Sequence, residues 1–470
     1  MTDLHLNNQL RTLEQIQPRR IVGSVDAVRG LSILVRDLPL PVGALVSVRH
    51  NGRGRATQPI ARGEVVGFDG SKSVVMLFGP GDGISPGMPV VGEQSAQTAQ
   101  VGESLLGRIM NGLGQPIDGG APLRDTVARP INPPPTSAMS RRCIDQALPT
   151  GVRVIDAMAT LGKGQRVGVF AGPGVGKSTL LASIARNCEA DVSVIAMVGE
   201  RGREVREFVE QTLGPDGLAR SVVIVATGDE SPLLRVRAAL LAATVSEYFC
   251  DLGRDVMLMM DSITRLAQAQ RQIGLNVGEQ PSTKGYTPSV FAILPTLLER
   301  AGAMECGGSV TGIYSVLVEG DDLTEPVSDA ARGILDGHIA LSRKLAGQGF
   351  FPAVDPMESI SRVADAVCDE HHISARRTLL RLMSAYAEAE ELIRIGAYAQ
   401  GSNPDCDVAI ALKSSIDEFL RQDARQSASY PHTCRALIEL AAAAEQHEAG
   451  RRPPATANGQ AGHAASGAGR

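Results

Sequence analysis

The spacing of hydrophobic and polar residues divides the chain into zones with different expected secondary structure. From residue 21 to residue 95, short apolar runs alternate with polar positions, as at Leu31, Ile33 and Val35. Turns rich in glycine, such as Asp69-Gly70, separate these runs. Short strands at this spacing are typical of a small antiparallel barrel or sandwich, so we expect a β-barrel domain over residues 21–95.

The second zone, assigned to residues 96–375, alternates strands with helices from about residue 150. Helical stretches at 232–250 and 262–273 lie between short apolar runs. The alternation predicts an α/β domain with a parallel sheet that is covered by helices on both faces. The expected buried strands are 167–170, 192–198, 222–226 and 256–260. Before them, the proline-rich segment 129–135 can form neither a helix nor a central strand, and we expect a stiff connector there.

The two ends of the chain differ from this pattern. From residue 376 to residue 448 apolar residues such as Leu379 and Leu382 follow a helical period, which predicts a helical C-terminal domain. Residues 449–470 are rich in Ala, Gly and Pro and should be disordered. Residues 1–20 carry leucines at helical spacing, which fits either a short amphipathic helix that needs a partner or a frayed terminus.

Composition narrows the classes of function. The formal net charge is -5, aromatic residues make up 3% and Trp is absent, which argues against a dedicated nucleic-acid binder. Seven Cys in 470 residues are too sparse for a disulfide scaffold. The chain contains no apolar run of the roughly 18 residues that a membrane-spanning helix needs. These features leave a large cytoplasmic enzyme or a subunit of an assembly.

The strongest motif is a glycine-rich loop between the predicted strand ending at Phe170 and a helix. Its backbone N–H groups and the helix N-terminus would bind phosphates. Lys177 would reach the β- and γ-phosphates, and the Ser178 hydroxyl would bind Mg²⁺. Ala171 replaces the first glycine of the strict pattern, which is a mild departure. The residues that would hold the nucleotide here are Gly172, Pro173, Gly174, Val175, Gly176, Lys177, Ser178 and Thr179.

Two carboxylates follow other predicted strands. Asp261 ends the apolar run 256–260, where it would lie beside the loop and hold the metal's water shell. Glu200 follows the run 192–198, at the sheet edge where ligands bind in open α/β sheets. It could orient the attacking water in hydrolysis. The alternative for Glu200 is a solvated charged loop, in which the carboxylates and arginines of residues 200–204 pair with one another.

Four segments together resemble the hexameric rotary-type ATPases, whose nucleotide-binding core is RecA-like. The resemblance spans about residues 20–445 and implies the order of barrel, RecA-like P-loop core and helical domain. Within this group the flagellar export and type III secretion ATPases fit best, and the acidic loop of the synthases is absent after Ile395. The segments are 171–179, Gly199-Glu200-Arg201, Asp261-Ser262-Ile263-Thr264-Arg265 and Pro352 to Arg362.

The resemblance assigns further roles. It implies that Arg201 lies next to the catalytic Glu200, that Glu204 belongs to the outer metal shell, and that Arg265 lies near the γ-phosphate. Phe351 would place its ring against adenine; the alternative is a core phenylalanine. Arg362 would be the arginine finger that reaches into a neighbouring subunit's site; the alternative is a structural salt bridge.

The expected function is Mg²⁺-dependent ATP hydrolysis that energises flagellar export, in the cytoplasm and with peripheral recruitment to the inner-membrane export apparatus. The resemblance implies a homohexamer, a stator-like regulator at residues 1–20, a coiled-coil stalk protein, the membrane export gate, and chaperone–substrate complexes. The alternatives are an injectisome ATPase, the catalytic subunit of a rotary synthase, a hexameric RNA helicase, and a binding module with a dead site. We read His371-His372 as a solvated helix start rather than a metal site.

Overall fold

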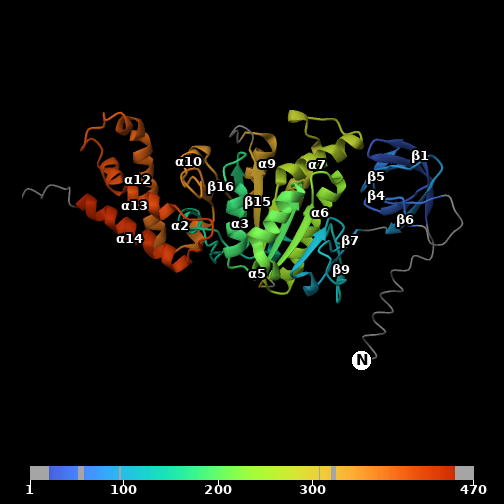
Figure 1. The fold of residues 1–470 in the computed structure, drawn as a ribbon, viewed down its shortest axis with the longest axis horizontal. Helices are drawn as coiled ribbons and strands as arrows, with labels where there is room; N and C mark the ends of the chain where they lie inside the picture. The colour runs from blue at the N-terminus through green and yellow to red at the C-terminus, as the bar shows by residue number, and fades with distance from the viewer. Residues whose placement is uncertain (1–20, 51–57, 95–96, 306, 319–323, 450–470) are drawn as a thin grey trace, which may run out of the picture.

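The computed structural model describes residues 21–50, 58–94, 97–305, 307–318 and 324–449. A small barrel, a central sheet with its helices and a bundle of C-terminal helices follow one another along the long axis (Figure 1). This arrangement confirms the predicted fold class. The expectations for residues 1–20 and for 450–470 lie outside the described residues.

Six antiparallel strands form the barrel, which closes in the order β1-β2-β5-β4-β3-β6. Alternate residues point inward, and Ile33, Val35, Val65 and Val75 are completely buried, whereas Leu31 is exposed. The period of two that the sequence showed therefore supplies the barrel core, although Leu34 and Val74, at the intervening positions, are buried as well. The strands are β1 (Val22–Arg29), β2 (Ser32–Arg36), β3 (Leu45–Val48), β4 (Ala61–Asp69), β5 (Lys72–Leu77) and β6 (Pro89–Gln94).

A short ribbon joins the barrel to the core. Strand β7 (Thr98–Val101) pairs with β9 (Val127–Pro130), with Thr98 opposite Pro130. The predicted connector thus begins as a strand of a two-stranded ribbon, where each strand is an edge and tolerates proline.

The central sheet has the order β17-β16-β10-β15-β13-β11-β12-β8, with β14 paired to β15. The path is parallel from β16 to β8, and only β17 runs antiparallel at its end. The carboxyl ends of β10, β11 and β13 therefore meet at one edge, where the glycine-rich loop follows β10, Glu200 lies beyond β11 and Asp261 ends β13. The strands are β8 (Arg108–Asn111), β10 (Arg166–Ala171), β11 (Val192–Val198), β12 (Ser221–Ala226), β13 (Asp255–Asp261), β14 (Gly302–Ala303), β15 (Ser309–Leu317), β16 (Gly337–Ala340) and β17 (Ile360–Ser361).

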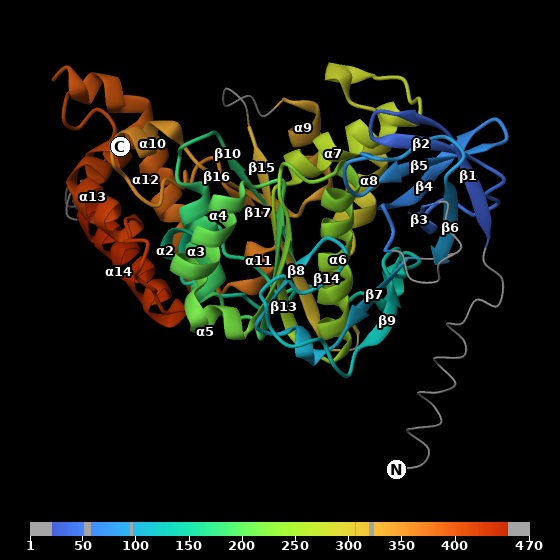
Figure 2. The same ribbon diagram turned by 45° about the vertical axis from the view of Figure 1, so that its right-hand side comes forward.

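Two hydrophobic cores cover the two faces of this sheet, as predicted. In β11, Val194 and Ala196 belong to one core, and Ile195 and Met197 belong to the other. Figure 2 shows α3, α4 and α5 on one side of the strands and α6, α7 and α8 on the other. The helices are α2 (Arg153–Met158), α3 (Lys177–Asn187), α4 (Gly202–Glu207), α5 (Gly214–Ala219), α6 (Pro232–Asp251), α7 (Ile263–Asn276), α8 (Pro288–Leu298), α9 (Pro326–Ile334), α10 (Arg343–Gly347) and α11 (Ala364–Val367).

The C-terminal part consists of α12 (Glu370–Arg394), α13 (Pro404–Leu420) and α14 (Tyr430–Ala449). Asp369 caps α12, because its side chain accepts from the His372 N–H at 2.8 Å. The prediction that a helix starts here is confirmed. The prediction that His372 is solvated is wrong, because its side chain is 1% exposed. The His372 Nε2 lies 2.8 Å from the Ala157 carbonyl oxygen of α2, so this ring joins the helical part to the core.

Candidate functional site

The glycine-rich loop lies between β10 and α3, as the sequence predicted. Gly174 and Gly176 have φ values of 78° and 94°, in the left-handed region that a side chain disfavours. Gly176 is the N-cap of α3, so Lys177 and Ser178 occupy the first turn of an eleven-residue helix. The loop therefore presents unpaired N–H groups and the positive end of the helix dipole, which together fit the phosphates of a nucleotide.

Lys177 and Asp261 form an ion pair at the carboxyl edge of the sheet. The Lys177 Nζ donates to the Asp261 Oδ1, and both side chains are largely buried. Ser315 on β15, between β10 and β13, also donates to that carboxylate and lies 3.4 Å from the Lys177 Nζ. Asp261 therefore lies beside the glycine-rich loop, as predicted, and Ser315 contacts both members of the Lys177–Asp261 pair.

Glu200 lies just beyond β11 and is 5% exposed, so the alternative of a solvated loop does not describe it. Its Oε2 lies 3.3 Å from the Arg265 Nη2, while the Arg265 Nη1 donates to the Gly199 carbonyl oxygen. Its Oε1 is buried and has no hydrogen-bond partner among the described residues. A buried oxygen without a partner at the phosphate end suits a water molecule that awaits activation.

The surroundings of Glu200 change its acidity. Burial, followed by the Asp261 carboxylate and by Glu204, raises the pKa of Glu200 to about 7, against the smaller opposing effects of Lys177 and Arg265. A carboxyl group with such a pKa exchanges a proton near neutral pH, as a catalytic base does.

Four of the predicted residues surround one small hollow of about 40 Å³: Ser178, Glu200, Glu204 and Asp261. Hydroxyl and carboxylate oxygens are the ligands that Mg²⁺ prefers, and it is usually bound by one or two carboxylates together with substrate phosphates. Within the described ranges, no group of three or more His, Cys, Asp or Glu side chains could hold a metal ion by itself. The donor set therefore fits Mg²⁺ that arrives with a nucleotide. Arg201 lies apart from the hollow, exposed and paired with Glu204 at 3.4 Å.

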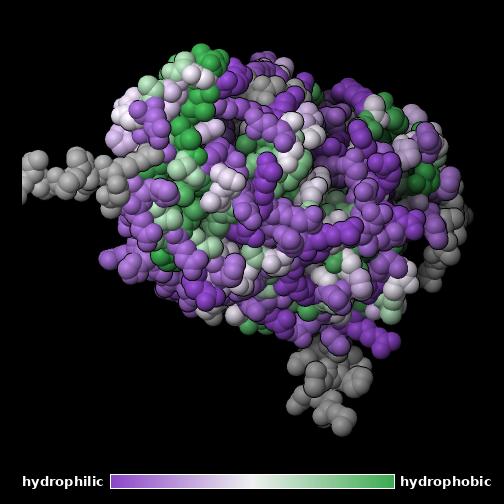
Figure 3. All heavy atoms as spheres, turned by 60° about the vertical axis from the view of Figure 1, so that its left-hand side comes forward, coloured by the Kyte–Doolittle hydropathy of each residue, from purple (hydrophilic) through white to green (hydrophobic). Residues whose placement is uncertain are grey.

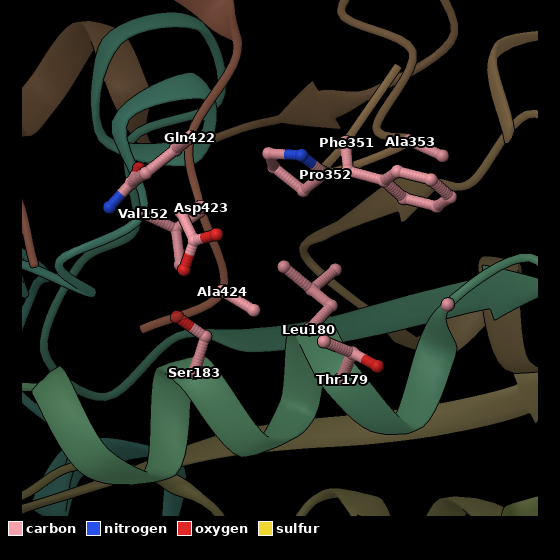
Figure 4. A pocket seen from close by; sticks show the side chains of 11 residues that line it. Val152, Thr179, Leu180, Ser183, Phe351, Pro352, Ala353, Gln422, Asp423 and Ala424 are labelled. Atoms are coloured by element: carbon pink, nitrogen blue, oxygen red, sulfur yellow. The ribbon is translucent and has the colours of Figure 1, made fainter. Parts of the chain in front are cut away.

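A second cavity of about 350 Å³ opens beside the start of α3, within the range of ligand pockets of about 300–1,000 Å³. Phe351 forms part of its wall and is 48% exposed, so it is not a core phenylalanine. A Cβ at Gly176 would lie 3.6 Å from the Phe351 ring, which places the ring against the phosphate loop. Figure 4 shows the ring and Leu180 facing the cavity. A ring in this position can stack on a base whose phosphates bind the loop.

The sequence missed the wall of this cavity that comes from the C-terminal part. Gln422, Asp423 and Ala424, in the segment between α13 and α14, complete the lining. No motif marks them, since a loop contact more than 240 residues from the phosphate loop leaves no local pattern. The Gln422 N–H donates to the Phe351 carbonyl oxygen at 3.0 Å and so joins the two walls.

Arg362 does not lie with the other candidates. It follows β17, and its N–H donates to the Asp336 carbonyl oxygen at 3.0 Å, while the Asp336 N–H donates to Arg166, the first residue of β10. Arg362 therefore lies at the amino edge of the sheet, one strand length from its own phosphate loop. Its side chain is exposed and forms no ion pair with any described residue, so the alternative of a structural salt bridge does not apply.

Comparison with known proteins places these features in a family. Family models match residues 151–361 as the nucleotide-binding domain of the ATP synthase alpha/beta family, 44–93 as its beta-barrel domain, and 368–439 as the T3SS EscN ATPase C-terminal domain. A flagellum-specific ATP synthase of Treponema pallidum is 49% identical, covering 91% of this chain and 95% of that protein. A type 3 secretion system ATPase of Xanthomonas euvesicatoria is 44% identical, covering 92% and 96%.

Solved structures agree with the sequence comparison. The assembled ATPase EscN of the enteropathogenic E. coli type III secretion system, solved also in complex with its central stalk EscO, matches with a TM-score of 0.82. It is 38% identical, and the match covers 89% of this chain and 100% of that one.

Proposed function

Because the chain belongs to the family of flagellar and type III secretion ATPases, we propose that it hydrolyses ATP with Mg²⁺ to energise protein export through a flagellar type III apparatus. The observation that carries this proposal is the meeting of Lys177, Glu200 and Asp261 at one edge of the sheet, beside a phosphate-binding loop. A binding module with a dead site would not need a buried carboxylate there with a pKa of about 7.

The residues divide the work of phosphoryl transfer. The loop N–H groups and Lys177 bind the phosphate oxygens, and Ser178 with Asp261 holds the Mg²⁺ that comes with the nucleotide. Mg²⁺ supplies neutralisation of the phosphate charge when it is bound. Glu200 orients the attacking water through its free oxygen, and Arg265 holds Glu200 at 3.3 Å while presenting a cation to the phosphate end.

Flagellar export is the main proposal because a flagellum-specific relative is 49% identical, against 44% for a type 3 secretion system ATPase. An injectisome ATPase is the second candidate, supported by the C-terminal family model of EscN over residues 368–439. Deletion of the gene separates them: loss of flagellar filaments with export of other substrates intact supports the first, and the reverse supports the second.

We propose that the chain assembles with copies of itself into a homohexamer. Arg362 lies exposed at the edge of the sheet opposite its own Glu200, so it can reach such a carboxylate only in a neighbouring copy. The ATPase EscN, a relative with 38% identity, was solved in an assembled form, which supports assembly of this chain with its own copies. The finger would then cancel charge on the transferring phosphoryl group.

The partners are also proposals. A relative binds a central stalk, and this chain exposes Leu392 and Ile395 at the end of α12, where a coiled-coil stalk would find apolar contacts. Figure 3 shows the largest group of hydrophobic side chains on this face at its upper left, with smaller hydrophobic groups elsewhere among hydrophilic residues. A stator-like regulator at residues 1–20, the export gate, and chaperone–substrate complexes complete the set. Over the described residues, no helix is long and apolar enough to cross a membrane.

Specific ATPase activity measured against protein concentration tests this function. We expect activity per molecule to rise with concentration, because the proposed sites form between copies, and to fall by about 10²-fold or more in both Glu200→Gln and Arg362→Ala. Activity near zero at every concentration would favour a synthase subunit that lacks its sister chain. High activity that is independent of concentration and of Arg362 would exclude the shared site.

A further inference from the structure

The segment between α13 and α14 forms one wall of the base cavity, where Gln422 is buried and Asp423 is exposed. Gln422 uses all of its polar side-chain atoms to hold this wall: its Oε1 accepts from the Arg153 N–H at 2.7 Å, and its Nε2 donates to the carbonyl oxygens of Gly151 and Gln426. With the bond to Phe351, these contacts engage the backbone N–H and both polar side-chain atoms of Gln422. They fix the position of its neighbour, Asp423.

Asp423 keeps one acceptor free. Its Oδ1 accepts from the Arg425 N–H at 2.8 Å, and its Oδ2 accepts no hydrogen bond from the described residues. Ser183 on α3 accepts from the Asn187 amide at 3.3 Å and retains its O–H for donation. Figure 4 shows Asp423 and Ser183 at one end of the cavity and Phe351 at the other. A base that enters past Phe351 would thus meet an acceptor beside a donor.

We propose that Asp423, together with Ser183, selects adenine as the nucleobase. This inference rests on the proposed ATPase function and deepens it. The free Oδ2 accepts a hydrogen bond from the exocyclic amino group of adenine, and the Ser183 hydroxyl donates to a neighbouring ring nitrogen. Adenine has a donor and an acceptor side by side on its edge, which is complementary to this pair.

Stacking on Phe351 cannot make this choice. Every base has a π-face, so stacking on an aromatic ring tolerates any of them. Discrimination must come from polar groups that face the base edge, and Asp423 is the charged side chain in the cavity lining. Guanine has a keto oxygen where adenine has its amino group, so two acceptors would face each other without a hydrogen bond.

A carboxylate can also recognise guanine when both of its oxygens accept, one from the ring N–H and one from the 2-amino group. At Asp423 the Oδ1 already accepts from the Arg425 N–H, whereas Oδ2 accepts no hydrogen bond from the described residues, so a contact of both oxygens with guanine would have to share Oδ1 with that N–H. The pair therefore matches the single amino group of adenine better than the double donor of guanine.

The test measures binding without turnover. In a Glu200→Gln background, dissociation constants are measured by calorimetry for ADP, for purine riboside 5′-diphosphate, which lacks the amino group, and for GDP. We expect ADP to bind about tenfold or more tightly than the purine analogue, as a hydrogen bond to a charged group implies. Asp423→Ala should remove this preference and leave the affinity for the purine analogue unchanged.

Two further variants serve as controls. Asp423→Leu keeps about the bulk of the side chain but offers no acceptor, so it should remove the preference for ADP over the purine analogue, as Asp423→Ala does. Glu418→Gln, an exposed residue of α13 outside the cavity, removes one charge and should change none of the three constants.

The outcomes separate this inference from the function on which it rests. Tight ADP binding with an unchanged preference in Asp423→Ala would overturn the selection of adenine and leave the ATPase proposal intact. Equal loss of all three nucleotides in Asp423→Ala would make the residue structural and would also overturn it. Failure of the parent protein to bind any nucleotide would remove both proposals.

Discussion

The two edges of the central sheet differ in how their candidate residues are held. At the carboxyl edge, Lys177, Glu200 and Asp261 are mostly buried and bonded to one another or to Ser315 and Arg265. At the amino edge, Arg362 is exposed and its side chain has no ion pair among the described residues. Six residues of β10 separate the edges, which is about 17 Å.

This difference fits the proposed shared site, in which one chain carries every catalytic residue and two copies form each site. Lys177, Glu200 and Asp261, which would act in their own subunit, are already paired with neighbouring residues of opposite charge. Arg362, which we propose acts on a neighbouring subunit, has no ion pair among the described residues of its own chain. The contrast therefore supports a site shared between copies, and each edge can be tested separately.

We expect the largest effect from a substitution of Arg362, at the amino edge of the sheet. We expect Arg362→Ala to lower kcat about 10³- to 10⁵-fold, because the charge-cancelling side chain is lost, while ADP binding remains. Steady-state kinetics and calorimetry measure the two effects. Arg332→Ala is the matched control, because Arg332 is also an exposed arginine near the same histidine. Burial lowers the pKa of His338 most, and the charges of Arg332 and Arg362 lower it further. An equal loss in both variants would point to general surface charge instead.

At the carboxyl edge, Glu200→Gln keeps the shape of the side chain and removes its basicity. We expect kcat to fall about 10²- to 10⁴-fold, with nucleotide binding retained. Single-turnover hydrolysis of bound ATP measures the step directly. Turnover within threefold of the parent, on the order of half a kcal/mol, would remove Glu200 from the chemistry.

The base cavity lies beside the start of α3 and should contribute to affinity more than to rate. Phe351→Ala should weaken ADP binding about 5- to 150-fold, since stacking of a base on a ring contributes about 1–3 kcal/mol. Phe351→Tyr keeps the ring and should bind as the parent does. A loss in the tyrosine variant as large as that in the alanine variant would show that the ring does not stack.

We also expect a pH dependence of kcat/KM, which arises from Glu200 at the carboxyl edge. The pKa of Glu200 in the nucleotide-free protein is raised to about 7, so the carboxyl group is protonated below that pH and cannot take a proton. The value of kcat/KM should therefore fall about tenfold per pH unit below pH 7, and the decline should be absent in Glu200→Gln. A flat profile down to pH 5.5 would show that Glu200 is not the titrating base.

Much of the fold could be predicted because the signals were local. The loop at 171–179 lies between a run of buried apolar residues and a helix, and Asp261 ends another such run. The edge strand β8 was missed, because Arg108–Asn111 is short and only partly buried. His372 was misjudged, because its burial comes from Ala157 and Cys434, which are distant in the sequence.

The candidate site was likewise predictable only where the signal in the sequence was local. Residues carried by motifs were found, whereas Ser315 and Asp423 were not, since each becomes relevant only through tertiary contacts. Arg362 was identified by resemblance, and its isolation from its own site became visible only in the topology of β16 and β17.

The most direct test of the shared site mixes two inactive variants. Arg362→Ala supplies an intact Glu200, and Glu200→Gln supplies an intact Arg362. In an equal mixture that assembles at random, about a quarter of the interfaces would unite both intact residues. We predict that activity returns on mixing, to a maximum near equal proportions, under conditions where the differently tagged variants co-purify. Co-purified mixtures that stay inactive at every proportion would contradict the shared site.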